Sequence, residues 1–296
     1  MPVGGNCSAS SSHGDHRTRA FGMIIVAEIK IVLLSNIGGG KSTLLNSIEK
    51  KKTGLDLLPL LSMPGEGLKV RRESQRTLNI VDKFFYPTLF MQQGDVKFKT
   101  GNPKFPTLQT TKSDLLFMSE LAILRSTVQE EREDEELGGI IFRERCVYDM
   151  RHVFVKNLVK KELLSQEQFD DYCTIFDQLV NPLTPPDLFI YLSTRPKTVF
   201  KRRMAELKKG GGLESEQGLT EQYVTEIHKL YERLVYVILP GLIPDFKVRR
   251  LIIDANNDLS PEELEKFHRY VELRAKKILQ QRGINSNTSR VRKKGR

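Results

Sequence analysis

The sequence predicts an α/β fold in which a parallel five-stranded sheet lies between helical layers. Short apolar runs alternate along the chain with longer stretches in which apolar residues recur at helical spacing. This alternation is typical of a parallel sheet covered on both faces. Two capping boxes, at 165–168 and 260–263, mark helix starts. The expected strands are 28–34, 57–61, 139–143, 187–193 and 249–254.

Local sequence signals support each expected element. The strands are short apolar runs that end at turn or cap signals, and the first is rich in β-branched residues. After the first capping box, the residues at helical spacing are Phe169, Tyr172, Phe176 and Leu179. After the second, they are Leu264, Phe267, Val271 and Ile278. Each set predicts one buried helix face.

Composition limits the class of protein. The chain has 296 residues, of which 39% are hydrophobic, enough to bury a core. No apolar run approaches the roughly 20 residues of a membrane span, so we expect a soluble protein with no membrane partner. Three widely spaced cysteines predict neither a disulfide framework nor a zinc site. A reducing compartment fits best, and we expect the cytoplasm ahead of mitochondria or the nucleus.

Positive charge is concentrated at the C-terminus. The formal net charge is +10, and +6 of it comes from six basic residues after position 281. We therefore expect a folded domain at 23–281 between disordered tails at 1–22 and 282–296. Contact of the basic tail with nucleic acid is not expected, because most such tails are simply solvated. The acidic run at 130–136 is expected to be a solvated helix end or loop.

A glycine cluster directly after the first expected strand predicts a phosphate-binding loop. Its backbone N–H groups can surround phosphates, Lys41 adds positive charge for the β- and γ-phosphates, and the Ser42 hydroxyl can bind Mg²⁺. Ser35 stands where the full motif has its first glycine. The alternative is a glycine turn without a ligand. The expected ATP-binding residues of the loop are Asn36, Ile37, Gly38, Gly39, Gly40, Lys41, Ser42 and Thr43.

A carboxylate and a guanidinium follow the strand at 139–143. Carboxyl ends of parallel strands face the same crevice, so Glu144 and Arg145 are expected beside the phosphate loop. There Glu144 could hold Mg²⁺ together with Ser42, and Arg145 could neutralise charge on a hydroxyl that is being phosphorylated. The Asn-Lys-x-Asp element of GTPases and the signature of transport ATPases are absent from the sequence.

With these motifs, the chain resembles the deoxynucleoside kinase family from about residue 28 to residue 280. Five ordered blocks carry the resemblance: 36–43, 105–110, 144–154, 187–196 running into Arg202, and 216–219 followed by Tyr223. The resemblance implies a P-loop kinase fold with a lid segment. It also implies ATP and Mg²⁺ as cofactors, a role in the salvage of DNA precursors, and a homodimer by analogy.

For the acceptor site, the resemblance implies a role for each matched residue. Gln109 would pair with the nucleobase edge through its amide donor and acceptor. Phe154 would stack on the base, Glu216 would accept the 3′-hydroxyl, and Arg145 would contact the 5′-hydroxyl region. Considered singly, Gln109 would be expected to be a surface amide and Phe154 a core residue. A role in substrate binding is favoured only because the five matching blocks occur in the family's order along the chain.

For the donor site, the resemblance implies that Arg202 lies against the adenine. The loop holding Asp254 and Asn256 would surround the edge of that base, and 201–212 would form the lid. The expected cationic contacts of the lid are Lys208 and Lys209.

The sequence departs from the family at several positions. Met63 stands where the family has its general-base glutamate, and Glu66 is the candidate to replace it. The lid lacks the family's arginine cluster. For the sugar-contacting tyrosine, Phe98 matches by spacing from Gln109 and Tyr86 is the other candidate.

Two apolar residues stand where deoxycytidine-type members carry an arginine and an aspartate. These are Leu116 and Met150, which leave room for a methyl group and remove cytosine-selective charges. We therefore expect ATP-dependent 5′-phosphorylation of a deoxynucleoside, with thymidine as the first acceptor and deoxycytidine as the second. The alternative is a catalytically impaired, nucleotide-binding relative that serves as a structural or regulatory subunit. A nucleic-acid-binding protein ranks last.

Overall fold

The computed structural model describes residues 28–51, 68–91, 95–102, 105–137, 139–211 and 214–282. The expected tails, except Arg282, and the expected strand 57–61 lie outside these ranges. Met63 and Glu66 lie outside them too. The predicted domain boundaries therefore stay predictions.

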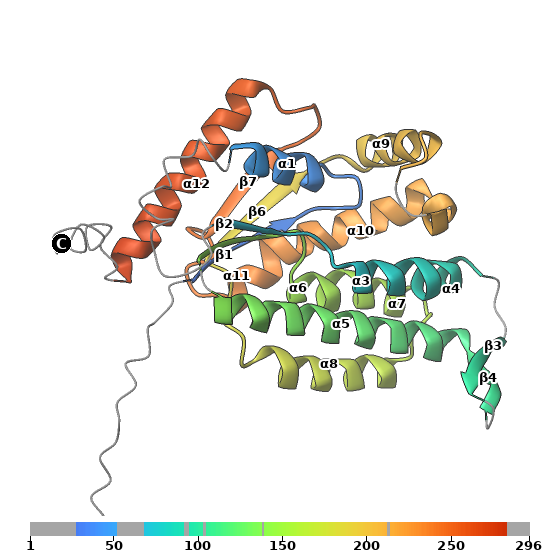
Figure 1. The fold of residues 1–296 in the computed structure, drawn as a ribbon. Coiled ribbons are helices and arrows are strands. Elements are labelled where there is room, and N and C mark those ends of the chain that lie inside the picture. Colours follow the sequence, from blue (N-terminus) through green and yellow to red (C-terminus); the bar gives the residue numbers. More distant parts are fainter. Residues whose placement is uncertain are drawn as a thin grey trace, which may run out of the picture.

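A five-stranded parallel sheet forms the centre of the molecule (Figure 1), as the sequence predicted. Its order is β2-β5-β1-β6-β7. The strands are β1 (Glu28–Leu34), β2 (Leu68–Arg71), β5 (Gly139–Arg143), β6 (Leu188–Ser193) and β7 (Arg250–Asp254). Four of them match the expected strands to within one residue. The sequence missed β2 because Leu68 is the one fully buried residue of this short edge strand.

Helices cover both faces of the sheet (Figure 1), and alternation along β1 sends its side chains to both layers. Ile29, Ile31 and Leu33 pack in one apolar cluster with α1 and α12, whereas Val32 and Leu34 join the larger cluster on the other face. The helices of the first layer are α1 (Lys41–Lys51) and α12 (Pro261–Gln281).

The larger layer contains three helical segments with short π-helical stretches, together with two long regular helices. The segments are α3 (Gln75–Ile80), η1 (Val81–Phe85) and α4 (Tyr86–Phe90); α6 (Val147–Asp149), η2 (Met150–Val155) and α7 (Lys156–Lys160); and α10 (Glu221–Arg233), η4 (Leu234–Ile238) and α11 (Leu239–Leu242). The long helices are α5 (Lys112–Leu137) and α8 (Gln166–Val180). The remaining elements are α9 (Pro196–Lys208), η3 (Glu214–Gly218) and the antiparallel strands β3 (Asp95–Asn102) and β4 (Phe105–Thr111).

Both predicted capping boxes are confirmed. At the start of α8, the Ser165 side chain accepts from the Gln168 backbone N–H and the Gln168 side chain returns to the Ser165 N–H. Ser260 and Glu263 make the same reciprocal bonds at the start of α12. Just after the other end of α12, Arg282 forms an ion pair with Asp187 at 2.5 Å.

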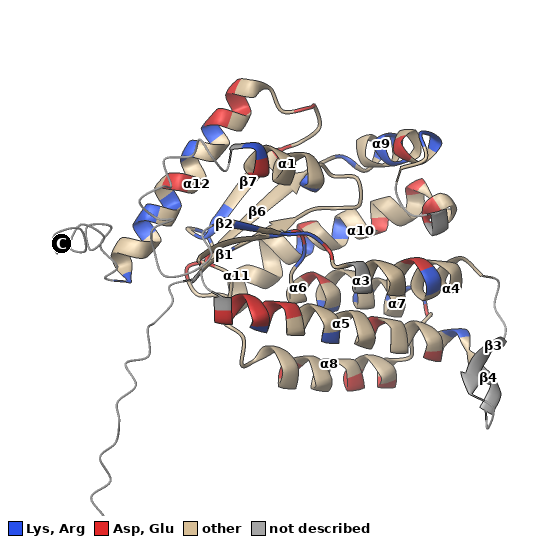
Figure 2. Ribbon diagram, in the orientation of Figure 1, with Lys and Arg blue, Asp and Glu red and all other residues tan. Residues whose placement is uncertain are grey.

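The acidic run at the end of α5 is structural rather than merely solvated. Figure 2 shows acidic residues gathered there, beside the sheet. Glu131 and Asp134 are buried: Glu131 binds the buried Lys30 ammonium at 3.2 Å, and Asp134 pairs with Arg143 and with Arg71. Ion pairs therefore connect the end of α5 to three strands of the sheet, β1, β2 and β5. The expectation that the whole acidic run is solvated was wrong for Glu131 and Asp134.

Replacing Asp134 by alanine is expected to lower the free energy of unfolding by about 3–5 kcal/mol, because Arg143 would stay buried without its nearest carboxylate. Equilibrium urea denaturation measures this loss. The exposed neighbour Glu133, changed to alanine, is the control and should shift stability by no more than about 0.5 kcal/mol. Equal losses in both variants would contradict the structural role of the pair.

Among the described residues, no helix has the combination of length and apolar character that crossing a bilayer requires.

Candidate active site

The phosphate loop lies between β1 and α1, as predicted. Gly38 and Gly40 have positive φ angles of 73° and 98°, which side chains rarely adopt, so glycine is needed at both positions. The Asn36 side chain holds the loop in place: its Nδ2 donates to the Val224 carbonyl at 2.7 Å and its Oδ1 accepts from the Ile37 N–H at 2.8 Å. The backbone is therefore fixed in the curved conformation that a phosphate requires.

Ser35 takes part in the loop through its hydroxyl. The Lys41 ammonium donates to the Ser35 hydroxyl and carbonyl, both at 3.2 Å, and burial lowers the pKa of this lysine, partly offset by Glu144. A Cβ at Gly39 would come within 2.7 Å of the Ser35 hydroxyl. The serine that departs from the motif thus fills the space beneath the loop and positions the lysine.

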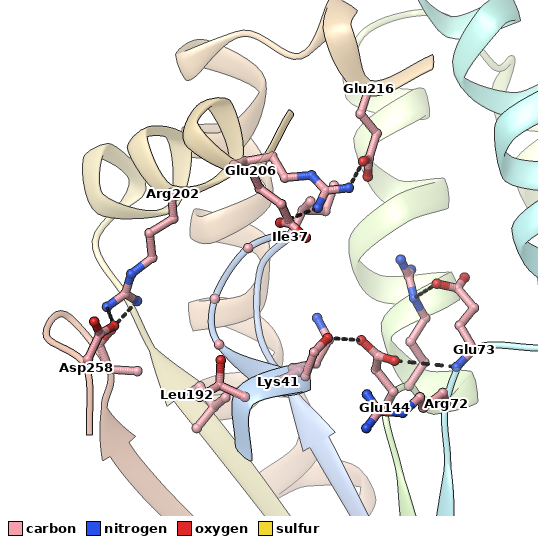
Figure 3. Close-up of a pocket in the computed structure, with 18 of the residues that line it drawn as sticks. Ile37, Lys41, Arg72, Glu73, Glu144, Leu192, Arg202, Glu206, Glu216 and Asp258 are labelled. Atoms are coloured by element: carbon pink, nitrogen blue, oxygen red, sulfur yellow. Dashed lines mark hydrogen bonds and ion pairs between the residues drawn. The ribbon is translucent and has the colours of Figure 1, made fainter. Parts of the chain in front are cut away.

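One open cleft of about 700 Å³ joins this loop to the carboxyl ends of β2 and β5. Figure 3 shows Glu73 and Glu144 on one side of the cleft, with Arg202 and Asp258 on the other. Most of the predicted site residues in the described part of the chain line it. These are Ile37, Gly38, Gly39, Gly40, Lys41, Ser42, Thr43, Glu144, Arg145, Arg202 and Glu216.

The two predicted metal ligands lie together. The Ser42 hydroxyl donates to the Glu144 carboxylate at 3.5 Å (Figure 3). The second Glu144 oxygen accepts from the Glu73 backbone N–H, also at 3.5 Å. A hydroxyl and a carboxylate are hard oxygen donors, which fits Mg²⁺, an ion that keeps several waters and takes few protein ligands.

Glu73 is a functional candidate that the sequence analysis missed. It follows β2 by two residues, and its carboxylate pairs with the Arg145 guanidinium at 3.2 Å (Figure 3). Burial opposes the charge of Arg145, but neighbouring groups, Glu73 foremost, raise its pKa overall. A carboxylate that directly follows a strand could have identified Glu73 from the sequence, but β2 was not predicted as a strand.

The wall next to this ion pair is aromatic. Tyr86 lines the cleft, and burial raises the pKa of its phenol. The Arg145 guanidinium lies 4.8 Å from the centre of the Phe154 ring, and Met150 lies beside them in a smaller cavity. Of the two candidates for the sugar-contacting position, Tyr86 lines the cleft, and the side chain of Phe98 lies outside the described part of the structure.

The lid side of the cleft carries an arginine that sequence analysis did not single out. Arg203, on α9, pairs with Glu216 and also with Glu206, the latter at 2.6 Å (Figure 3). The adjacent Arg202 points the other way and donates to the Ala255 carbonyl at 2.7 Å, with Asp258 3.2 Å away. The two neighbouring arginines thus bind different parts of the cleft wall.

Several predicted residues do not reach the cleft. Leu116 is fully buried in the core and lines neither cavity, because it faces the helices packed on α5. Lys208 and Lys209 are exposed at the end of α9. Asp254 accepts hydrogen bonds from the backbone and side-chain N–H groups of Asn256, while Ala255, Asn257 and Asp258 line the cleft.

Two predicted acceptor residues, Phe98 and Gln109, lie on the β3–β4 pair, and the structure describes only the backbone of both. Lys97 lies opposite Gln109, and Phe98 lies opposite Leu108. β3 and β4 form a separate two-stranded antiparallel sheet.

Comparison with known proteins agrees with this arrangement. A family model described as deoxynucleoside kinase matches residues 105–278, more than half of the chain. Deoxyadenosine kinase of Dictyostelium discoideum is 30% identical over 112 residues, which are 36% of this chain and 44% of the relative. The chain thus spans less than half the length of that relative. Human deoxycytidine kinase is 24% identical over 236 residues, covering 77% of this chain and 84% of the relative.

Solved structures share the fold. Deoxyadenosine kinase from M. mycoides, with dCMP and a flexible dCDP bound, matches with a TM-score of 0.56 at 19% identity, covering 83% of this chain and 100% of that one. The same enzyme with bound dATP matches with a TM-score of 0.57 at 18% identity. Together with the matched family model, the P-loop and the Glu144–Arg145 pair at one cleft lead to one conclusion: the chain belongs to the deoxynucleoside kinase family.

Proposed function

We propose that this protein transfers the γ-phosphoryl group of ATP to the 5′-hydroxyl of a deoxynucleoside. Pyrimidine deoxynucleosides are the favoured acceptors, thymidine first and deoxycytidine second. The observation that carries the proposal is a single cleft that holds both the P-loop lysine, Lys41, and the Glu73–Arg145 pair.

The residues of the cleft suit each part of the transfer. Glu73 can accept the proton of the 5′-hydroxyl, and Arg145 can neutralise the charge that develops on that oxygen. Lys41 and the loop N–H groups would hold the phosphates. Magnesium, bound by Ser42 and Glu144, would supply charge neutralisation between the β- and γ-phosphates.

Glu73 can supply the general base that the family has at the position of Met63. The sequence suggested that Glu66 replaces a missing base, but Glu66 lies outside the described residues. Glu73 lies where β2 ends, beside the arginine of the acceptor side, and its carboxylate faces the cleft. We therefore propose Glu73 as the general base, which removes the main reason for reading the chain as catalytically impaired.

The preference for pyrimidines is supported by the size and apolar character of the acceptor side. Met150, Phe154 and Ile123 line the small inner cavity beside Arg145. Met150 brings no charge to this point, where the resemblance implies a charged residue in deoxycytidine-type members. The relatives named above are deoxycytidine and deoxyadenosine kinases, so the preference for thymidine rests on these side chains alone.

Phosphorylation of the four natural deoxynucleosides with ATP and Mg²⁺ tests the proposal. We expect turnover of thymidine and deoxycytidine, with kcat/KM for both purines lower by at least about tenfold, since a ring-sized mismatch costs more than about 1.4 kcal/mol. Comparable turnover of all four would contradict the pyrimidine preference. ATP binding without any transfer would instead favour the nucleotide-binding, non-catalytic alternative.

A further inference from the structure

One buried carboxyl group in the acceptor side has no role so far. Glu120 lies on α5, one helical turn after Leu116, and is 2% exposed. It lines an inner cavity of about 20 Å³. This cavity shares Val81, Tyr86 and Arg145 with the large cleft, so it is the inner end of the same site.

Glu120 differs from the other buried acids of its helix. Glu131 and Asp134 are each paired with a buried or half-buried cation. By contrast, Glu120 makes no hydrogen bond or ion pair with any residue the structure describes. A carboxyl group that is almost wholly buried and has no hydrogen-bond partner is costly, so its presence at the cavity needs an explanation. Its surroundings suggest that a ligand supplies the missing partner.

The size of the inner cavity limits what this partner can be. A volume of about 20 Å³ holds one water-sized group and not an aromatic ring. The ring of an acceptor base would therefore lie in the cleft, near Tyr86 and Arg145, and only a substituent on its far edge would enter. Apart from Arg145 at the entrance, Glu120 is the only charged side chain among the described residues that line this cavity.

Resting on the proposed function, we propose that Glu120 is a specificity-determining residue, whose carboxyl group reads the exocyclic group at C4 of the acceptor base. This group is a carbonyl in thymine and an amino group in cytosine. A protonated carboxyl can donate to the carbonyl or accept from the amino group, whereas an ionised one can only accept. The protonation state of Glu120 would therefore decide which base it favours.

The surroundings of Glu120 keep it protonated at neutral pH. Burial raises its pKa to about 8; Arg145 opposes this rise and Asp149 adds to it. The other titratable groups that interact with it are Tyr172 on α8 and Tyr223 on α10, whose own pKa values are raised by burial. Below about pH 8 Glu120 can thus donate to thymine, and above that pH it loses the donor.

The expected result is a change of specificity with pH. Above about pH 8, kcat/KM for thymidine should fall about tenfold per pH unit relative to kcat/KM for deoxycytidine, because the protonated fraction falls by that factor. The measured quantity is the ratio of kcat/KM for thymidine to kcat/KM for deoxycytidine. Groups that act on both acceptors, such as Lys41, affect both values equally, so their titration does not change the ratio. The ratio should be flat between about pH 6 and 7.

Glu120→Gln is the matched variant, since its amide keeps a donor and an acceptor but does not titrate. It should use both acceptors with a ratio that stays constant to about pH 9, whereas Glu120→Leu should lower kcat/KM for both by at least about tenfold. Thermal melting shows whether the variants fold. An unchanging ratio in the wild type, or the same pH-dependent ratio in Glu120→Gln, would overturn the proposal.

Calorimetric titration of thymidine and deoxycytidine, without ATP, separates this proposal from the proposed function. If thymidine binds more weakly above about pH 8 in the wild type but not in Glu120→Gln, the result supports the role of Glu120 even if no phosphate is transferred. Binding of both nucleosides that does not depend on pH overturns that role even if the protein is an active kinase.

Discussion

Replacing Glu73 by glutamine is expected to lower kcat for the acceptor nucleoside by about 10²- to 10⁴-fold. The glutamine keeps the shape of the side chain and a partner for Arg145, but it cannot take the proton of the 5′-hydroxyl. The P-loop contacts of Lys41 lie on the other side of Glu144 and are unchanged. The affinity for ATP should therefore stay close to that of the wild type, as steady-state kinetics and ATP titration can measure.

Glu133→Gln is the matched control for this variant. The side chain is exposed on α5 and accepts a hydrogen bond from the Gln129 amide, so the same chemical change should leave kcat within about twofold. If Glu73→Gln retained more than a tenth of the wild-type rate, Glu73 would not be the general base. A carboxylate outside the described residues, Glu66, would then be the next candidate.

Replacing Lys41 by methionine is expected to lower kcat/KM for ATP by at least about 10²-fold. Methionine has a similar length but brings no positive charge to the phosphates. The loss should appear in kcat as well as in KM, because charge on the phosphates grows in the transition state. Initial rates across ATP concentrations give both values.

Lys50→Met provides the control, because Lys50 lies on the same helix, α1, and is exposed. It should leave both kinetic values within about twofold of the wild type. Ser35→Gly restores the full motif and would remove one of the contacts that hold Lys41. Equal rates for Lys41→Met and Lys50→Met would contradict a phosphate-binding role of the loop.

Much of the fold could be predicted because its signals are local. The run of β1 and the glycines after it identify a strand, a turn and a helix start within a few residues. Capping boxes at Ser165 and Ser260 predicted two helix starts, since a cap depends only on neighbours in the chain. The edge strand β2 was missed, because one buried residue gives no apolar run.

The candidate site was predicted where its residues belong to a motif, as in the P-loop and at Glu144 and Arg145. Glu73 was missed because the comparison with the family pointed to Met63, whereas Glu73, which follows the end of β2, lies ten residues further along the chain. The sequence left Phe98 and Tyr86 both open for the sugar-contacting position, and in the structure Tyr86 lines the cleft.

The sequence by itself determined the α/β class, the phosphate loop and the resemblance to deoxynucleoside kinases, since these depend on residues adjacent in the chain. Only the tertiary structure decided which carboxylates meet which cations. It paired Glu73 with Arg145, tied the acidic end of α5 to the sheet, and left Glu120 buried without a partner. The physical reason is that the burial and pairing of a charge depend on groups brought together from distant parts of the chain.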